Sequence, residues 1–470
     1  MKKRILKDES ERLGVSPEKN QEYAAKLTQM INCKTVWTKN GENLAEFQRF
    51  YATVEKLFPN VAAKAKKLVF GEGCFFYVIE GSDAKRNILL MSHHDVVDGG
   101  EGWDSDPFFA TERDGYLYGR GTIDTKTPLF AELMAAEELL ADGYDFNGIN
   151  LYIGSSNNEE VAGDGMVLAT EYFKANGIRF DIVLDEGGAI TEGQIPGVKS
   201  KSAVVAVHEK SRHYFKCKLD STQVGHGGFG KAADSAAENM SRFISEVKAA
   251  DIYKGNFYPE VRATFERHAP YMSFPMNLLF GNMTLFSPII KKIMMGIPAA
   301  SAMLSTTVSF TTVFAGDEAQ PLFRSKTAEA VMFIRCIRED DLYRGLEKIK
   351  EIGKKYGVTI EEIERDYCQP TDFNGDAFRL VESVLNDNFP DVIVAPFLLT
   401  AGTDARRFTD VANNILRFAP IDLNKKQFAT IHNPNEHIAI SNIGQCVVFY
   451  KEFVKRTCKE QNLFNKGKLT

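Results

Sequence analysis

Residue types that bind metal ions gather at three points in the first half of the chain. The first is His93 with Asp95 at the end of an apolar run. The second is Asp124, a lone carboxylate where a predicted helix opens, and the third is the adjacent pair Glu159 and Glu160. Imidazole nitrogens and carboxylate oxygens are the donors of a hydrolytic Zn²⁺ centre. Together the three points predict a metal site, although any one of them alone would be weak evidence.

Apolar runs of the buried-strand type position these side chains. Polar residues follow each run directly, and the runs are 87–91, 149–153 and 181–184. In an open α/β sheet, ligands bind beyond the carboxyl ends of the strands, so we expect residues distant in sequence to meet at that edge. Asp124 reaches the same edge through a helix predicted over 129–140, with Pro128 in its first turn and Gly143 beyond its end.

The adjacent glutamates are expected to have different roles. On an extended backbone, the side chains of Glu159 and Glu160 diverge, so one is expected to bind metal and the other to transfer a proton. Asp95 follows His93 at the right spacing to orient its imidazole through a hydrogen bond. His94 faces the other way along an extended chain, and we interpret it as structural.

The composition is typical of a folded enzyme. The 470 residues are 44% hydrophobic and 26% charged with a net charge of -6, which is enough for two domains with their own cores. No basic patch indicates a nucleic-acid partner. The 7 cysteines are scattered and odd in number, so neither a disulfide framework nor a thiolate metal site is indicated, and we expect buried thiols.

Two segments bear on location. Residues 1–9 are charged and lack the apolar stretch of a secretory signal, which predicts a cytoplasmic protein. The least polar stretch, 271–304, is interrupted by prolines and by Lys291 and Lys292. It never reaches the roughly 18 uninterrupted apolar residues of a spanning helix, so no integral membrane segment is expected. We interpret this stretch as a pocket wall or a subunit contact, with a peripheral membrane contact as the minor alternative.

Further motifs follow in order along nearly the whole chain. They are Trp103 with Pro107-Phe108, Gly119-Arg120-Gly121 before Asp124, Glu159-Glu160 with Gly163 and Gly165, Leu184-Asp185-Glu186-Gly187-Gly188, Gly225-His226, Gly402-Thr403-Asp404-Ala405-Arg406, and His432-Asn433-Pro434-Asn435-Glu436. This set resembles the zinc metallopeptidase and aminoacylase family of carboxypeptidase S, aminoacylase, glutamate carboxypeptidase, PepV-type dipeptidase and succinyl-diaminopimelate desuccinylase. Residues 414–420, ahead of His432, are most similar to the carboxypeptidase S branch.

The resemblance implies an α/β fold with a discontinuous catalytic domain. This zinc-exopeptidase-like domain has a mixed sheet flanked by helices, and an α+β lid domain is inserted into it. The metal-site motifs place the catalytic domain at 1–202 and 370–470 and the lid at 203–369. In many family members the lid forms a dimer contact, so the resemblance allows a homodimer through this domain. Within the lid, strands are expected at 204–207, 214–219 and 332–335, and helices at 234–250 and 340–355.

The resemblance also implies the roles of the metal-site residues. Asp124 is the carboxylate that bridges two metal ions, His93 is a ligand at the first site, and His432 closes the second. Glu160 is a further ligand. Glu159 is the general base that takes a proton from the bridging water and returns it to the leaving nitrogen.

One ligand stays open between two neighbours. Asp185 and Glu186 both follow the right strand, and family members differ over which position binds the first metal ion. Glu186 is favoured, and the other carboxylate would then hydrogen bond to a ligand. Because the donors are carboxylates and imidazoles without thiolate, we expect two Zn²⁺ ions per chain, with Co²⁺ or Mn²⁺ as alternatives.

The resemblance places further residues around the substrate. His226 matches the lid histidine that polarises the scissile carbonyl, frequently from the neighbouring subunit, and the alternative is an ordinary turn histidine. Arg335 matches the lid arginine that binds the substrate carboxylate through two hydrogen bonds. Gly402 and Thr403 would complete this anion pocket with backbone and hydroxyl donors.

Three departures from the family pattern concern specificity. The family usually has Asp-Asp-Lys-Gly at 124–127, Asp at Asn158 and Asn-Val-x-Pro at 320–323, where this chain differs. None of the metal-ligand positions is lost, so the chemistry is expected to be kept.

The sequence therefore predicts a hydrolase that cleaves an amide bond beside a free carboxylate. As a carboxypeptidase, dipeptidase or N-acyl amino acid hydrolase, it would act on short peptides or N-acyl amino acids. Two alternatives stay open. One is an amidohydrolase for a non-peptide amide, and the other is a non-catalytic binding protein on the same fold.

Overall fold

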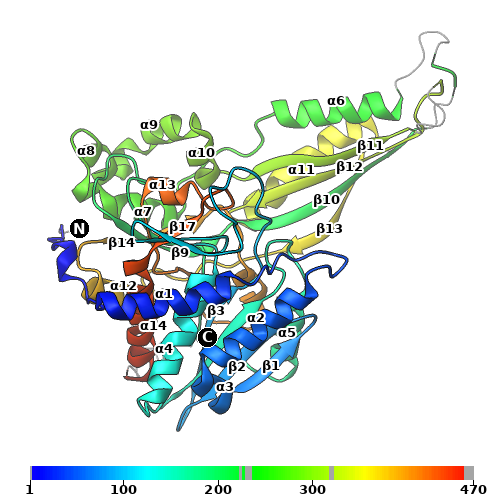
Figure 1. The fold of residues 1–470 in the computed structure, drawn as a ribbon. Helices are drawn as coiled ribbons and strands as arrows, with labels where there is room; N and C mark the ends of the chain where they lie inside the picture. The colour runs from blue at the N-terminus through cyan, green and yellow to red at the C-terminus, as the bar shows by residue number, and fades with distance from the viewer. Residues whose placement is uncertain (1–2, 222–224, 228–234, 317–321, 460–470) are drawn as a thin grey trace.

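A mixed sheet of ten strands forms the centre of the larger domain (Figure 1). The computed structural model describes residues 3–221, 225–227, 235–316 and 322–459. The strands follow the order β1-β2-β6-β3-β7-β15-β9-β8-β16, and β14 also pairs with β9. Their bounds are β1 Lys66–Phe70, β2 Cys74–Glu80, β3 Arg86–His93, β6 Ile149–Ser156, β7 Ile182–Asp185, β8 Ile190–Thr191, β9 Ser202–Glu209, β14 Ile393–Leu399, β15 Ile415–Arg417 and β16 Asp422–Leu423.

Four parallel neighbours, β6, β3, β7 and β15, carry the predicted site. Almost every residue of β3, β6 and β7 is buried. Parallel strands covered on both faces consist of nearly continuous apolar residues, which explains why the three apolar runs predicted strands correctly. His93 of β3 lies opposite Ser156 of β6, so both strands end at the same edge.

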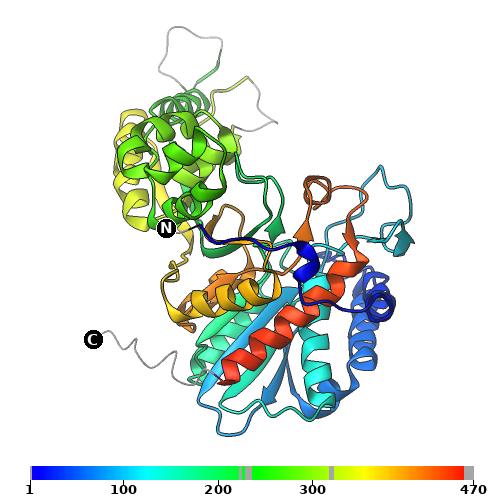
Figure 2. The same ribbon diagram turned by 90° about the vertical axis from the view of Figure 1, so that its left-hand side faces the viewer.

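Helices cover both faces of this sheet, and β3 shows how the two cores are divided. Ile88 and Leu90 enter the core under one helical layer, whereas Leu89 and Met91 enter the core on the opposite face. The first layer includes α14, drawn in red across the sheet in Figure 2. It is made of α1 Pro17–Ile31, α2 Leu44–Leu57, α3 Pro59–Lys64, α4 Lys126–Ala141, α12 Asp376–Asn388 and α14 Ile440–Lys459. The opposite face carries α5 Gly165–Ala175 and the short helix η3 Asp404–Asp410.

A second, antiparallel sheet projects from this body (Figure 1). Its order is β11-β12-β10-β13, and two helices cover one face. Alternate residues of β10 and β12 are buried under those helices, as expected for a sheet with one covered face. The elements are β10 Ser211–Asp220, α6 Ala236–Ala249, β11 Thr307–Ala315, β12 Thr327–Cys336, α11 Glu339–Tyr356 and β13 Thr359–Asp366.

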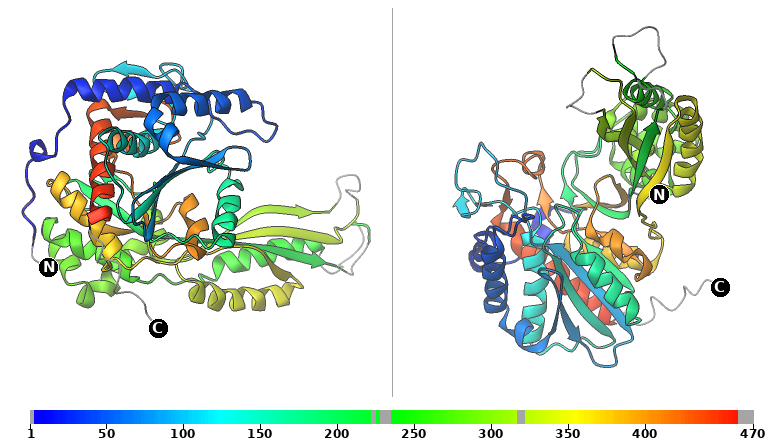
Figure 3. Two further views of the ribbon diagram at one scale, coloured as in Figure 1. Left: turned by 90° about the horizontal axis from the view of Figure 1, so that it is seen from below. Right: turned by 90° about the vertical axis from the view of Figure 1, so that its right-hand side faces the viewer.

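A group of helices lies at the other end of the molecule from the tip of the antiparallel sheet (Figures 1 and 3). It packs on β14 through α7 and shares a core with Ile393 and Leu398 of that strand. The group contains α7 Pro259–His268, η2 Ala269–Tyr271, α8 Met276–Gly281, α9 Met283–Met295 and α10 Pro298–Leu304. In the described part of the chain, no helix combines the length and the apolar character needed to cross a bilayer.

The structure differs from the predicted domain boundary in two places. Strand β9 belongs to the ten-stranded sheet, so the chain changes sheets between Glu209 and Ser211 rather than at residue 203. Residues 259–304 pack on β14 of the large sheet, although they lie inside the predicted lid range 203–369. Apolar strand residues such as 204–207 are equally typical of either sheet, and only the pairing with β14 decides between them.

The core under α5 gives a test of the fold. Phe173 is fully buried, and its ring lies 5.1 Å from the rings of both Phe76 and Phe180. Phe173→Ala should lower the free energy of unfolding by about 3 to 5 kcal/mol, because it leaves a cavity among these rings. Phe109→Ala, at a side chain that is 64% exposed, should change it by no more than about 0.5 kcal/mol in the same denaturant titration. Equal effects of the two substitutions would contradict this packing.

Candidate metal centre

Three of the predicted ligands meet at the carboxyl edge of the parallel strands. His93 ends β3, Glu160 follows β6, and Asp124 precedes α4. Each side chain offers one ligand atom, and these atoms all lie within 4.8 Å of one another. The structure therefore brings together residues that are more than sixty positions apart in the sequence.

Asp124 lies between two histidines. Its Oδ1 is 2.9 Å from Nε2 of His93, and its Oδ2 is 3.0 Å from Nε2 of His432. His432 Nε2 also lies 3.2 Å from Oε1 of Glu160. A carboxylate with one oxygen toward each of two imidazoles has the arrangement that bridges two metal ions.

The charges around Asp124 fit divalent cations. Burial raises the pKa of Asp124, but the hydrogen bonds of His432 and His93 outweigh it and lower the pKa below its ordinary value. Hydrogen bonds with Asp124 and Glu160 raise the pKa of His432 to about 10. The buried Oε1 of Glu160 has His432 Nε2 as its neighbour at 3.2 Å. Imidazole nitrogens and carboxylate oxygens held together in this way match the ligand set of Zn²⁺, Co²⁺ or Mn²⁺.

Asp95 holds the glutamate pair in place more directly than it holds the histidine. Its two carboxylate oxygens accept the backbone N–H groups of Glu159 and Glu160, at 3.1 and 3.0 Å. The nearer partner of His93 Nδ1 is the backbone carbonyl of Asp95 at 2.8 Å, whereas the Asp95 carboxylate lies at 3.5 Å. The predicted orientation of the imidazole by residue 95 therefore comes mainly from its main chain.

Glu159 lies among other acids. Burial raises the pKa of Glu159, His93 partly opposes this, and the negative charges of Asp404 and Asp95 raise it further, so it lies well above its ordinary value. No role for Asp404 was predicted from the sequence. The structure shows it buried, with its carboxylate accepting a hydrogen bond from Ser156 Oγ at 2.6 Å. A carboxyl with a raised pKa in such surroundings suits proton transfer.

The two neighbours after β7 have different surroundings. Both oxygens of Asp185 accept backbone N–H groups, one from Glu186 at 2.9 Å and the other from Ala405 at 2.8 Å. The pKa of Glu186 is raised by burial first and then by the charges of Asp124 and Asp185. The Glu186 carboxylate is therefore close enough to Asp124 to feel its charge, while Asp185 fixes the loop that carries Ala405.

Glu436 positions the loop before Asp124, and the sequence analysis assigned it no role. Its buried carboxylate accepts the backbone N–H groups of Gly121, Ile123 and Asp124 at 2.6 to 3.2 Å. It also accepts a hydrogen bond from Arg120 Nη1 at 2.8 Å. The signal was present in the sequence, because Glu436 ends the motif that begins at His432 and Arg120 lies in the motif before Asp124.

Arg335 lies where the two sheets meet. Its Nη2 donates hydrogen bonds to the carbonyl oxygens of Ala401 at 2.8 Å and Lys210 at 3.2 Å. A Cβ at Gly402 would lie 3.5 Å from Arg335 Nη2 and 3.3 Å from Arg406 Nη1, so the backbone of Gly402 lies directly beside both guanidinium groups. Arg335 and Gly402 are therefore neighbours, as predicted.

The prediction for Thr403 needs a correction. Its N–H and its hydroxyl both donate to Glu209 Oε2, at 3.2 and 3.1 Å, and Arg417 Nε donates to the same oxygen at 2.6 Å. Thr403 therefore holds a buried carboxylate of this chain and has no free donor for a substrate. Glu209 ends β9, and the sequence analysis missed it because it does not belong to any of the recognised motifs.

His226 lies away from the other site residues. Arg335 pairs with Arg212 near one end of β10, whereas His226 follows the other end and pairs with Phe323. The 10 residues of β10 span roughly 30 Å. Within one chain, the length of β10 therefore separates His226 from Arg335, which contacts the catalytic domain.

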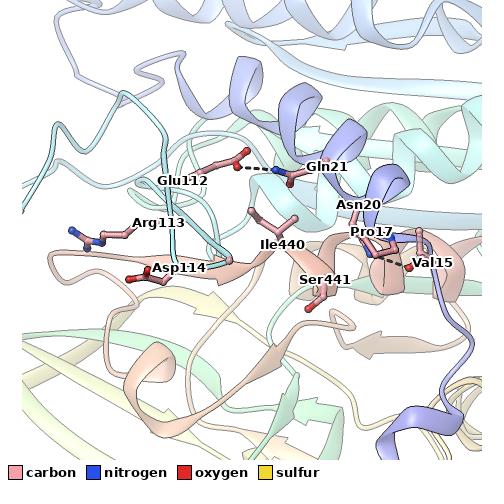
Figure 4. Close-up of a pocket in the computed structure, with 10 residues that line it drawn as sticks. Val15, Pro17, Asn20, Gln21, Glu112, Arg113, Asp114, Ile440 and Ser441 are labelled. Atoms are coloured by element: carbon pink, nitrogen blue, oxygen red, sulfur yellow. Dashed lines mark hydrogen bonds between the residues drawn. The ribbon is translucent and has the colours of Figure 1, made fainter.

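A surface pocket of about 660 Å³ lies elsewhere, between α1 and the start of α14 (Figure 4). Its lining includes Gln21, whose side chain donates to Glu112 at 2.9 Å, and Ile440. None of the predicted metal ligands lines this pocket.

Comparison with known proteins agrees with this geometry. The model of Peptidase family M20/M25/M40 matches residues 89–456, which include both histidines and all the carboxylates described above. The chain belongs to this family. The resemblance predicted from the motifs is thereby confirmed, and the M20/M25/M40 member described here is a hydrolase of the metallo-exopeptidase and aminoacylase type.

Relatives extend over most of this peptidase. It is 28% identical to "N-fatty-acyl-amino acid synthase/hydrolase PM20D1.1" of Danio rerio, over 94% of this chain and 87% of the relative. It is also 28% identical to "Probable carboxypeptidase S-like 2" of Dictyostelium discoideum, over 93% of this chain and 85% of the relative. The predicted similarity to the carboxypeptidase S branch agrees with this second relative.

Solved structures share the fold. An M20 family metallo-carboxypeptidase from Sulfolobus solfataricus has a TM-score of 0.66 at 18% identity, covering 92% of this chain and 98% of that one. A dinuclear metal-binding M20 peptidase from Bacillus subtilis has a TM-score of 0.57 at 11% identity, covering 93% and 99%. These structures confirm the predicted fold class of a mixed sheet flanked by helices.

The contacts of Glu436 predict an effect on metal binding. Glu436→Gln should weaken the affinity of this M20/M25/M40 peptidase for metal by roughly 10- to 100-fold, because the loop that holds Asp124 loses its charged acceptor. Glu329→Gln, on the lid surface beside Lys216, is the matched control and should leave the affinity unchanged. Competition with a chromogenic chelator measures both. Unchanged affinity in Glu436→Gln would show that the loop keeps its position without this carboxylate.

Proposed function

We propose that this M20/M25/M40 peptidase uses two metal ions per chain, zinc in the first place, to hydrolyse an amide bond beside a free carboxylate. Membership of the family supports amide hydrolysis in general. The observation that carries the finer proposal is the position of Asp124, with one oxygen toward His93 and the other toward His432.

The proposed ligands divide around Asp124. His93 and Glu186 would complete the first site, and His432 and Glu160 the second. Asp185 is the less suitable ligand because both of its oxygens already accept backbone hydrogen bonds. When bound, such ions polarise a carbonyl group and lower the pKa of water toward neutrality.

Glu159 is proposed to carry the proton. Glu159 and Glu160 lie in a turn after β6 rather than on the extended backbone that the sequence predicted, and Asp95 fixes this turn by accepting both of their backbone N–H groups. The raised pKa of Glu159 lets its carboxylate accept a proton from the attacking water and donate it to the leaving nitrogen.

Arg335 is proposed to bind the carboxylate of the substrate, with Gly402 giving access. The buried Nε of Arg335 has no hydrogen-bond partner among the described residues, so the guanidinium keeps an unused donor. A buried donor is costly to leave unpaired, which favours substrates that supply an anionic acceptor beside the scissile amide. The donors of Thr403 do not contribute, because Glu209 accepts both.

The substrate class follows from this pocket and from the relatives. We propose N-acyl amino acids or short peptides, and the relative from Danio rerio is named for N-fatty-acyl amino acids. Hydrolysis of a non-peptide amide is kept as the alternative, whereas a non-catalytic role does not agree with the enzyme family. A homodimer through the lid domain and a cytoplasmic location stay predictions.

The glutamate pair tests the division of roles. Wild-type chains should hold about two metal ions, and Glu159→Gln should keep both while kcat falls by roughly 10² to 10⁴. Glu160→Gln should lose metal, since it removes a ligand. Elemental analysis after gel filtration gives the metal content, and the two variants serve as controls for each other. Equal metal content in both variants would refute the assignment.

Arg335 tests the carboxylate pocket. Arg335→Ala should lower kcat/KM for free acids, with a loss of transition-state stabilisation on the order of 2 to 5 kcal/mol. It should have little effect on C-terminally amidated substrates, because only the acids lose an ionic partner. Arg365→Ala, an exposed arginine on β13, is the matched control. If the wild type cleaves amides as fast as acids, the pocket does not select a carboxylate and the non-peptide alternative gains support.

His226 tests whether a second subunit completes the site. His226→Ala should lower kcat by roughly 10² to 10³, the effect of losing one oxyanion donor, with little change in metal content. Since His226 is distant from the ligands of its own chain, mixed dimers of His226→Ala and Glu159→Gln chains should regain activity. Wild-type turnover by His226→Ala chains would instead make it an ordinary turn histidine.

A further inference from the structure

Helices α8 and α9 expose a row of large aliphatic side chains that the catalytic site does not use. Leu285 is 73% exposed, Ile289 54%, Ile293 57% and Ile297 50%. These positions recur every four residues, so they lie on one side of α9 and the turn after it. We call these four residues the α9 ridge. Phe274, just before α8, and Leu278, within it, add exposed apolar surface, at 79% and 50%.

The exposed face of α9 is more apolar than is usual for a helix face that contacts only water. Its opposite face is anchored in the protein by Met283, Ile290 and Met294, which are buried. A surface helix normally turns charged residues outward, and a helix that is apolar all round is usually covered. On the outer face of α9, beside the aliphatic residues, stand Thr284, Pro288 and Lys292.

Charge within the segment 267–316, which contains the α9 ridge, has one sign. No aspartate or glutamate occurs from residue 267 to residue 316, whereas the average frequency in this chain would place six or seven acids in a run of that length. Lys291 and Lys292 stand within α9, and neither ammonium group forms an ion pair with a described residue. The chain as a whole is acidic, at -6, so this region is a local exception.

The N-terminal segment adds positive charge to the same end of the molecule. Tyr271, which precedes α8, donates a hydrogen bond to the carbonyl of Arg4 at 2.9 Å. Lys3 lies over the ring of Tyr271, with its ammonium 5.3 Å from the centroid. Ile5, beside them, is 88% exposed. Ile5 and Lys3 therefore repeat, next to α8, the combination of an exposed aliphatic residue and a lysine that is found on α9.

We propose that α8 and α9 dock this protein onto a bilayer surface that contains anionic lipid. The α9 ridge enters the boundary between headgroups and acyl chains, and Lys292, on the exposed face beside the ridge, stays at the level of the lipid phosphates. An apolar face with lysines at its edge is the pattern of helices that lie in a membrane interface. Anionic headgroups supply the negative charge that the segment itself lacks. This inference does not depend on the proposed function.

A second copy of the chain fits the ridge less well. In a two-fold contact the same patch meets itself, so the lysines of both copies would approach each other. No acid between residues 267 and 316 could neutralise them. Lipid phosphates complement this charge, whereas the same face of another copy repeats it.

Flotation with vesicles tests the proposal on the full-length, metal-loaded protein. The wild type should float with vesicles of phosphatidylcholine containing about a third phosphatidylglycerol, and less with phosphatidylcholine alone. The double substitution Ile289→Asp with Ile293→Asp should reduce binding to both vesicles at least tenfold. Lys292→Gln should weaken binding to the anionic vesicles by roughly fivefold and leave the neutral vesicles unaffected.

The matched control is Ile363→Asp on β13, where the isoleucine is 53% exposed. It should leave flotation unchanged, and thermal unfolding should show that every variant is folded. Failure of the wild type to bind anionic vesicles would overturn the proposal, as would equal binding by the ridge variant. Sedimentation showing a dimer that Ile289→Asp with Ile293→Asp dissolves, without vesicle binding, would assign the ridge to self-association instead.

Discussion

Burial of like-charged carboxylates beside two histidines is the constraint on which the rest of this structure depends. Asp95, Asp185 and Asp404 are almost inaccessible to water, and Asp124 is largely buried between the imidazoles. Buried charges must be paired or hydrogen-bonded, because burial removes the water that would otherwise stabilise them. The fold supplies backbone N–H groups to Asp95 and Asp185 and imidazoles to Asp124. Positive charge on the two imidazoles, or a bound cation in their place, offsets the negative charge that Asp124 and Glu160 bring to this edge.

Parallel strands make this concentration of charge achievable. All of these strands end at the same edge, so the acidic residues that directly follow them lie close together without long connecting loops. This is also why so much could be predicted from the sequence. The apolar runs before His93, Glu159 and Asp185 are buried strands, and the residues after them meet as expected. Local sequence was sufficient wherever one strand and the residues after it fixed the position.

Features that depend on contacts between distant segments could not be predicted. Glu436 accepts backbone N–H groups from residues more than three hundred positions earlier. Its place in a recognised motif marked it as important, but the motif did not show which segment it contacts. Glu209, which lies outside the recognised motifs, accepts the hydrogen bonds from the N–H and the hydroxyl of Thr403. Thr403 therefore cannot have the substrate-binding role that its motif suggested. Strand β9 was predicted to belong to the lid but lies in the ten-stranded sheet, because it pairs with β14. Periodicity within a strand carries no information about the strand with which it pairs.

The chain passes from β9 of the ten-stranded sheet to β10 of the antiparallel sheet between Glu209 and Ser211. This junction would be the fulcrum of any rotation of the second sheet relative to the first. Arg335 sits close to it and holds the carbonyls of Lys210 and Ala401, whereas His226 lies beyond the far end of β10. Because β10 spans roughly 30 Å, a rotation of about 5° at the fulcrum would carry the far end by about 3 Å. The carboxylate pocket would barely move. In such a rotation, the end of the antiparallel sheet near Arg335 would keep its contacts with the catalytic domain, while the opposite end of that sheet would move much farther.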